Sequence, residues 1–249
     1  MMSNIYLATN FVRIVHGNLP IILTCPHGGE ASPGIIPHLA LLTPKCCKHK
    51  NSQDRHTSIV TRGIAEHIFA QTGRLPYVVE ALFHRKFIDA NRKRICSLTD
   101  PRGIRFYNQY HSSIATFIET IQQKYDGKGF LFDIHGSSLN FMSNYIYLGT
   151  KNGETLLPYF DRSEIYAKNG LVRSLEESPR HYTVIPNNEF DRELCKVNGG
   201  YTVEKYSNRI NCIQIELESM IRDIPQKREF LIQDLSNAIV RFVSNNIVL

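Results

Sequence analysis

The chain has 249 residues, of which 42% are hydrophobic and 21% are charged, so its composition is that of a folded globular protein with no sign of disorder. Its formal net charge is +6, but the Lys and Arg residues are scattered without long basic runs, which argues against nucleic acid as a partner. No apolar run approaches the roughly 18–20 residues of a membrane span, and no secretory leader is visible. These features predict one domain, residues 1–249, with no membrane partner and a cytoplasmic location.

The cysteines form no CxxC pair and show no repeated spacing. Without a secretory leader, they are interpreted as reduced thiols and not as metal ligands. They are Cys25, Cys46, Cys47, Cys96, Cys195 and Cys212.

Short apolar runs alternate with longer amphipathic stretches along the chain. Runs rich in β-branched and aromatic residues predict buried strands at 21–24, 77–81, 129–134, 145–148 and 213–217. Amphipathic periodicity predicts helices at 53–72, 107–125 and 227–246, the first with Asp54 as N-cap and Gly73 as its C-terminal stop. Strands separated by helices predict an α/β protein whose largely parallel sheet is covered by helices on both faces.

Polar residues lie at the ends of the predicted strands, which is where ligands bind in α/β sheets. His27 and Glu30 follow the first predicted strand, and His135 follows the third. Two histidines and one glutamate form a catalytic zinc pattern, in which a vacant position holds water. The alternative for the first pair is a turn-capping histidine beside a surface glutamate. Asp133 is expected on the opposite face of its strand unless it bends in to partner a histidine.

A second group of residues predicts an anion site. Asn91 and Arg92 offer an amide donor and a planar guanidinium, which pairs with a carboxylate, and Arg85 is a second candidate contact. Tyr201 follows two glycines, which predict a mobile or tightly turned loop on which the tyrosine closes over substrate. The alternatives are a structural salt bridge for each arginine and a packed surface turn for the tyrosine.

Glu216 lies between two apolar residues of the last predicted strand. A carboxylate in such surroundings costs free energy unless it is paired or functional. The two interpretations are a general base and a core salt bridge.

Five segments together resemble the N-formylglutamate amidohydrolase family, which is similar to zinc carboxypeptidases and aspartoacylase-like deacylases. The segments are PHGG at 26–29, DANR at 89–92, DIH at 133–135, NGGY at 198–201 and QIE at 214–216. Their order matches the family over most of the chain. The resemblance implies a mixed, twisted sheet of about eight strands with helices on both faces.

The resemblance also implies roles for individual residues. One zinc ion per chain is held by His27, Glu30 and His135, Asn91 and Arg92 hold the substrate carboxylate, and the base is Glu216. Many members of the family have no glutamate three residues after the first histidine, so the chain departs from their pattern.

In those members an acidic residue further along the chain serves as the middle zinc ligand. Asp54 is the comparable residue of this chain, and it is the second choice for that ligand after Glu30. The alternative for Asp54 is the helix N-cap proposed above. His56, in the same DRHT motif, is a further candidate.

These inferences lead to a functional hypothesis. The chain is expected to be a zinc-dependent amidohydrolase that removes a formyl or another small acyl group from a carboxylate-bearing amide such as N-formylglutamate, releasing formate and the amino acid. Two alternatives stay open: a carboxypeptidase or N-acyl-amino-acid deacylase on the same site, and a metal-free protein of this fold that binds a small anion.

Overall fold

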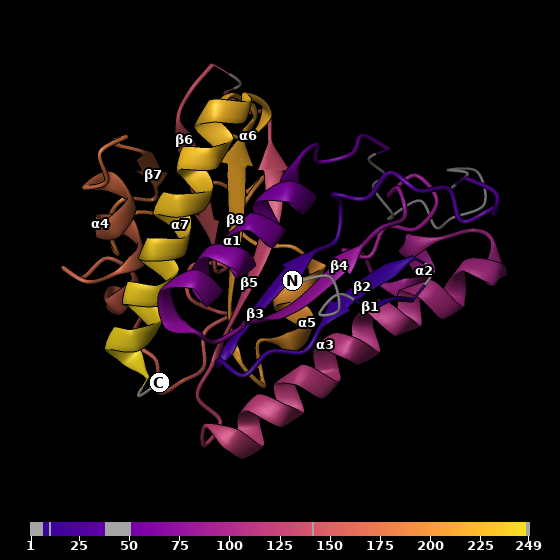
Figure 1. Cartoon of the computed structure of the whole chain (residues 1–249), viewed down its shortest axis with the longest axis horizontal. Coiled ribbons are helices and arrows are strands. Elements are labelled where there is room, and N and C mark those ends of the chain that lie inside the picture. The colour runs from indigo at the N-terminus through magenta and orange to yellow at the C-terminus, as the bar shows by residue number, and fades with distance from the viewer. Residues whose placement is uncertain (1–6, 10, 38–50, 141, 248–249) are drawn as a thin grey trace.

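The structure is a computed structural model of the chain and describes residues 7–9, 11–37, 51–140 and 142–247. Within these residues eight strands form one sheet (Figure 1). The strands are β1 (Leu7–Thr9), β2 (Val12–Val15), β3 (Ile21–Cys25), β4 (Tyr77–Ala81), β5 (Phe130–Ser137), β6 (Tyr145–Gly149), β7 (Thr183–Ile185) and β8 (Asn211–Glu218). The helices are α1 (Thr57–Thr72), α2 (Arg94–Ser97), α3 (Ile104–Lys124), α4 (Leu171–Glu176), α5 (Tyr201–Tyr206), α6 (Ser219–Asp223) and α7 (Pro225–Asn246), with 3-10 helices η2 (Pro101–Gly103) and η3 (Arg162–Ile165).

The order of strands in the sheet is β1-β2-β4-β3-β5-β8-β6-β7. The central strands β4, β3, β5 and β8 are parallel to one another. On one side β2 is antiparallel to β4 and β1 to β2, and on the other β6 is antiparallel to β8 and parallel to β7. The predicted α/β class, with a mixed and mostly parallel sheet, is confirmed.

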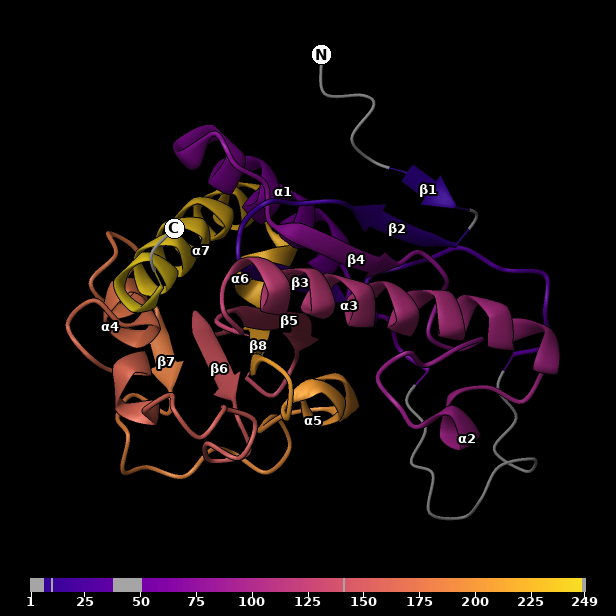
Figure 2. The ribbon, with the colours of Figure 1, turned by 90° about the horizontal axis from the view of Figure 1, so that it is seen from below.

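Alternate side chains of the central strands enter two separate hydrophobic cores. Phe130 and Phe132 of β5 pack with α1 and α7, whereas Leu131 packs with α3 and α5. Since successive side chains of a strand point to opposite faces, the two pairs of helices cover opposite faces of the sheet (Figure 2). Both faces of β3 and β4 are therefore buried, which explains their continuous apolar sequences.

The five predicted strands are present as β3, β4, β5, β6 and β8, and the three predicted helices as α1, α3 and α7. Gly73 ends α1 as predicted, with a φ of 67° and its N–H donated to the carbonyl of Phe69. The predicted start of α1 is wrong. The helix begins at Thr57, after His56 in a left-handed conformation, and the Asp54 carboxylate is directed elsewhere.

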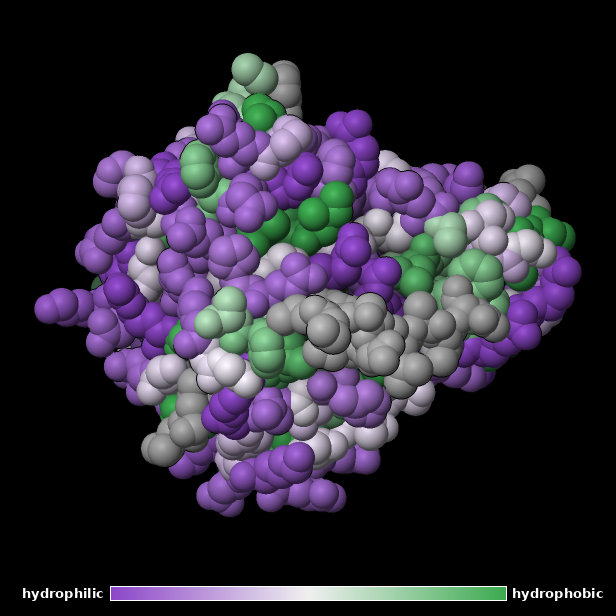
Figure 3. Space-filling view, in the orientation of Figure 1, coloured by the Kyte–Doolittle hydropathy of each residue, from purple (hydrophilic) through white to green (hydrophobic). Residues whose placement is uncertain are grey.

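The face of the molecule shown in Figure 3 is mostly hydrophilic, with smaller hydrophobic areas between the polar side chains. Among the described residues, no helix has the length and apolar character needed to cross a bilayer.

Candidate metal centre

Three side chains from distant parts of the chain meet beyond the carboxyl ends of β3 and β5. His27 follows β3, Asp54 precedes α1, and His135 lies near the end of β5. His27 Nδ1 lies 3.2 Å from His135 Nδ1, and Asp54 Oδ2 lies 3.3 Å and 3.1 Å from these two nitrogens. All three residues are buried, and they form the one cluster of possible metal ligands found among the described residues.

Each histidine is oriented by a second buried carboxylate. His27 Nε2 lies 2.7 Å from Asp89 Oδ1, and His135 Nε2 lies 2.9 Å from Asp133 Oδ2. An imidazole N–H donates to a carboxylate oxygen, so each Nε2 atom is placed to donate to its carboxylate. The Nδ1 atoms of both imidazoles then face Asp54.

Asp133 and His135 point to the same face of β5, because residues two apart on a strand share a face. The expectation that Asp133 lies on the opposite face is wrong, and no bend of the strand is needed to bring the two together. Asp133 is fully buried, and its Oδ1 accepts a hydrogen bond of 2.6 Å from Thr24 Oγ1 on the neighbouring strand β3. Thr24 thus fixes the carboxylate that orients His135.

Arg85 is also part of this network. Its Nη2 lies 2.6 Å from Asp89 Oδ2, and its Nη1 lies 3.5 Å from Asp54 Oδ1. Burial alone would raise the pKa of Asp89, but His27 and Arg85 hold it well below its usual range. Arg85 was predicted to contact substrate, and the structure shows its guanidinium paired with two carboxylates of the centre.

Asp54 is ionised for a similar reason. Burial would raise the pKa of its carboxyl group, but the imidazoles of His27 and His135 hold that pKa well below its usual range. The Gly136 backbone N–H also donates to Asp54 Oδ2, at 3.2 Å. Asp54 is therefore an anion that faces the Nδ1 atoms of both histidines.

Glu30 does not join the two histidines. Its side chain is exposed, and its Oε1 accepts a hydrogen bond of 3.3 Å from Gln53. The chain after His27 is not helical, and Ala31 forms a parallel bridge with Phe83, so positions three residues apart do not converge. The expected grouping of Glu30 with His27 and His135 is not found, and Asp54, the second choice, takes that place.

Asn91 is held by the NGGY segment. Its Oδ1 accepts hydrogen bonds from the backbone N–H of Thr202 at 2.7 Å and from its hydroxyl at 3.1 Å. A Cβ atom at Gly200 would overlap the Asn91 amide, so this glycine permits the close contact. The Asn91 Nδ2 then lies 3.2 Å from His135 Nε2. The loop is thus packed against the centre, as in the alternative of a packed turn.

Tyr201 belongs to the same packed region. It is half-buried, its ring centroid lies 5.7 Å from that of His111, and Lys205 lies over its ring. Tyr201 directly precedes Thr202, the residue that holds Asn91. Arg92 is also half-buried, and its Nη1 donates to the Asn91 carbonyl at 3.1 Å.

Glu216 lies beside His135 in the register of β8 and β5. Neighbouring parallel strands are about 4.8 Å apart, so the two side chains are close on the same face. Glu216 is half-buried, and Gln214 Nε2 donates to its Oε1 at 2.7 Å. The apolar neighbours Ile215 and Leu217 face the opposite side, which explains why a carboxylate lies within this apolar sequence.

The cysteines differ in state. Cys25, Cys195 and Cys212 are free thiols, and burial raises the pKa of Cys25 to about 12, so that it stays protonated close to the centre. Cys96 is disulfide-bonded, so the expectation that every cysteine is reduced is wrong for this residue. Cys46 and Cys47 lie outside the described residues.

The sequence interpretation gave Asp89 no role, and it foresaw Asp133 as a partner of a histidine only if the strand bent. A usable signal was present for Asp133, because the D-x-H spacing on a strand places both side chains on one face. Asp89 was recognisable only as part of the DANR motif.

Comparison with known proteins finds relatives by structure but none by sequence. No family model matches the chain, and no curated protein matches its sequence. An N-formylglutamate amidohydrolase from Ralstonia eutropha JMP134 superposes with a TM-score of 0.63 at 16% identity, covering 94% of this chain and 97% of that one. The gene product Atu2144 from Agrobacterium tumefaciens superposes with a TM-score of 0.60 at 16% identity, covering 95% and 96%. The chain therefore has the fold of an N-formylglutamate amidohydrolase, and the resemblance indicated by its five motifs is confirmed at the level of the fold.

Proposed function

We propose that the chain is a metal-dependent amidohydrolase that removes a formyl or other small acyl group from the nitrogen of an amino acid. The observation that carries the proposal is the convergence of two imidazole Nδ1 atoms and one carboxylate oxygen at 3.1–3.3 Å from one another. Two imidazole nitrogens and one carboxylate oxygen this close together offer three donor atoms to one metal ion.

His27, Asp54 and His135 fit a single zinc ion. Two histidines and one carboxylate form a common ligand set of catalytic zinc, and each histidine donates its other N–H to a carboxylate, as metal-binding histidines usually do. Zinc supplies Lewis acidity, by which a carbonyl is polarised and water becomes a nucleophile at neutral pH.

Glu216 is the proposed general base. It lies next to His135 across the strand pair and is half-buried. Gln214 Nε2 donates to its Oε1. As the base, Glu216 takes a proton from water and later passes it to the leaving nitrogen.

Arg92 is the proposed contact of the substrate carboxylate. Its guanidinium is half-buried, and one hydrogen bond to the Asn91 carbonyl anchors it beside the centre. Asn91 fixes the loop that carries Arg92 and presents its amide toward His135. Arg85 orients Asp89 and Asp54, and Tyr201 packs beside His111 next to Thr202, which holds Asn91. With the substrate held at one end, the reacting atoms meet in a productive geometry.

The test is release of formate or another acid from N-acyl amino acids by the purified, zinc-loaded protein. The wild type is expected to hydrolyse N-formyl amino acids, and Glu216→Gln is expected to lower kcat by about a hundredfold or more while zinc stays bound, since general bases contribute about 10²–10⁴. Loss of activity without loss of zinc would separate the base from the ligands. Full activity of Glu216→Gln, or cleavage of peptides in preference to N-acyl amino acids, would contradict the proposal.

A further inference from the structure

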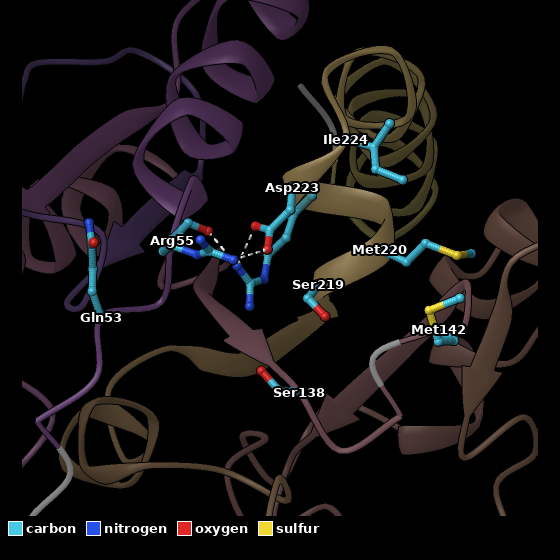
Figure 4. A pocket seen from close by; sticks show the side chains of 9 residues that line it. Gln53, Arg55, Ser138, Met142, Ser219, Met220, Asp223 and Ile224 are labelled. Carbon is cyan, nitrogen blue, oxygen red and sulfur yellow. Dashed lines mark hydrogen bonds and ion pairs between the residues drawn. The ribbon is translucent and has the colours of Figure 1, made fainter.

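A pocket of about 460 Å³ lies beyond the carboxyl ends of β5 and β8, under α6 (Figure 4). Figure 4 shows Gln53 and Arg55 on one side of it and Met142, Met220 and Ile224 on the other. Its volume is within the range of small-molecule sites.

The pocket lies next to the segments that carry the proposed metal centre. Gln53 and Arg55 flank Asp54 in the chain, and Gln53 Nε2 donates at 2.7 Å to the carbonyl of Gly28, the residue after His27. Arg222, which lines the pocket, donates to the Ser137 carbonyl at 3.2 Å, two residues beyond His135. The lining residues of the pocket thus contact the segments that carry His27 and His135 and flank Asp54 in the chain.

The charged groups of the pocket are engaged with one another. Asp223 accepts hydrogen bonds of 2.9 Å from Arg55 and from Arg222, and it lies 2.9 Å from His56 Nδ1. Arg222 gives its other hydrogen bonds to backbone carbonyls, at Leu217, Arg55 and Ser137. The charged side chains of this wall thus bind one another, so we expect the opposite wall to determine which substituent binds in the pocket.

The opposite wall is apolar and open to solvent. Met142 is 71% exposed and Ile224 is 43% exposed, whereas Met220 is half-buried. Exposed apolar side chains grouped beside a polar site mark a surface that is covered by a ligand. Methionine side chains are flexible and adapt to aliphatic groups of different shape.

We infer that this pocket binds an uncharged aliphatic substituent of the substrate, of about the size of a leucine or methionine side chain. The inference rests on the proposed function and specifies its substrate class, since it favours an apolar substituent over the acidic side chain of N-formylglutamate. The substituent belongs either to the amino acid or to the acyl group, and the two sources share the same chemistry.

The experiment compares kcat/KM for N-formylglycine, N-formylleucine and N-formylglutamate, and separately for glycine carrying formyl and hexanoyl groups. N-formylleucine is expected to exceed both other formyl substrates by about tenfold or more if the side chain occupies the pocket. If the acyl group occupies it, N-hexanoylglycine exceeds N-formylglycine by a similar factor.

The double variant Met142→Gln, Met220→Gln keeps the volume of the wall but makes it polar. It is expected to lose about tenfold in kcat/KM for the preferred aliphatic substrate and to change N-formylglycine less than twofold. Leu194→Gln is the matched control, because Leu194 is also partly exposed, at 44%, and lies outside the pocket lining. The control is expected to behave as the wild type.

Binding to Glu216→Gln, measured by calorimetry, separates the two claims. Preferential binding of N-formylleucine or N-hexanoylglycine without turnover in the wild type would uphold the pocket and contradict the proposed function. Two outcomes would uphold the proposed function and overturn the inference. In the first, the enzyme hydrolyses the substrates without preferring an aliphatic one. In the second, it prefers N-formylglutamate, and Arg55→Gln abolishes that preference.

Discussion

The substitution Asp133→Asn tests whether a buried carboxylate prepares His135 for the metal. In the native structure Asp133 Oδ2 accepts from His135 Nε2 at 2.9 Å, while Oδ1 accepts from Thr24 at 2.6 Å. Asparagine has nearly the same shape, but its amide can donate where the carboxylate can only accept. A donor facing Nε2 favours the tautomer that carries its proton on Nδ1, the atom directed toward Asp54.

Removal of such a hydrogen-bond partner typically weakens metal binding by about 10–100-fold, which corresponds to about 1.4–2.8 kcal/mol. We therefore expect the zinc dissociation constant of Asp133→Asn to rise by this factor, measured by competition with a chromophoric chelator. Asp234→Asn is the matched control, because Asp234 is also buried, and it is paired with Tyr182 and Arg180. An Asp133→Asn protein that folds and binds zinc as tightly as Asp234→Asn would refute the reasoning.

Three further predictions follow from the same geometry. Asp54→Asn is expected to weaken zinc binding at least about tenfold, whereas Glu30→Gln is expected to leave zinc affinity unchanged. Competition with a chelator measures the zinc affinity of both variants. An equal loss of zinc affinity in the two variants would restore Glu30 as a ligand. Gly200→Ala is expected to cost about 1–3 kcal/mol in urea unfolding, since its Cβ would overlap the Asn91 amide; unchanged stability would contradict this contact. Burial lowers the pKa of His111 from 6.5 to about 3. Between these two pH values the histidine is protonated in the unfolded chain but not in the folded one. The free energy of unfolding therefore falls as the pH is lowered, by up to about 1.4 kcal/mol per pH unit. His111→Phe should lack this part of the slope between pH 6 and 4, and an identical slope would show that another group is responsible.

The sheet was predictable because its central strands are buried on both faces and so have continuous apolar sequences. Strands β1, β2 and β7 were not anticipated, and they are the short strands at or near the sheet edges, with three, four and three residues. Helices α3 and α7 are long and amphipathic, and both were found within a few residues of their ends. Local pattern is thus sufficient where an element is long or fully buried.

The candidate centre was less predictable, because its parts are brought together by the fold. His27 and His135 were identified from their places after strands, but the position of Asp54 resembled that of a helix N-cap. Its carboxylate reaches residues 27 and 81 positions away in the chain. Conversely, the short spacing of His27 and Glu30 suggested chelation, and the extended backbone after β3 separates them. Spacing alone indicates convergence only once the local conformation is known.

The most direct test of the account is the metal content of protein purified without added metal, measured by elemental analysis for the wild type beside His135→Ala. The account predicts about one zinc ion per chain in the wild type and its loss in a variant that remains folded by circular dichroism. Wild-type protein that contains no metal and takes up none when zinc is supplied would contradict the metal-dependent hydrolase and favour a protein of the same fold that binds a small anion.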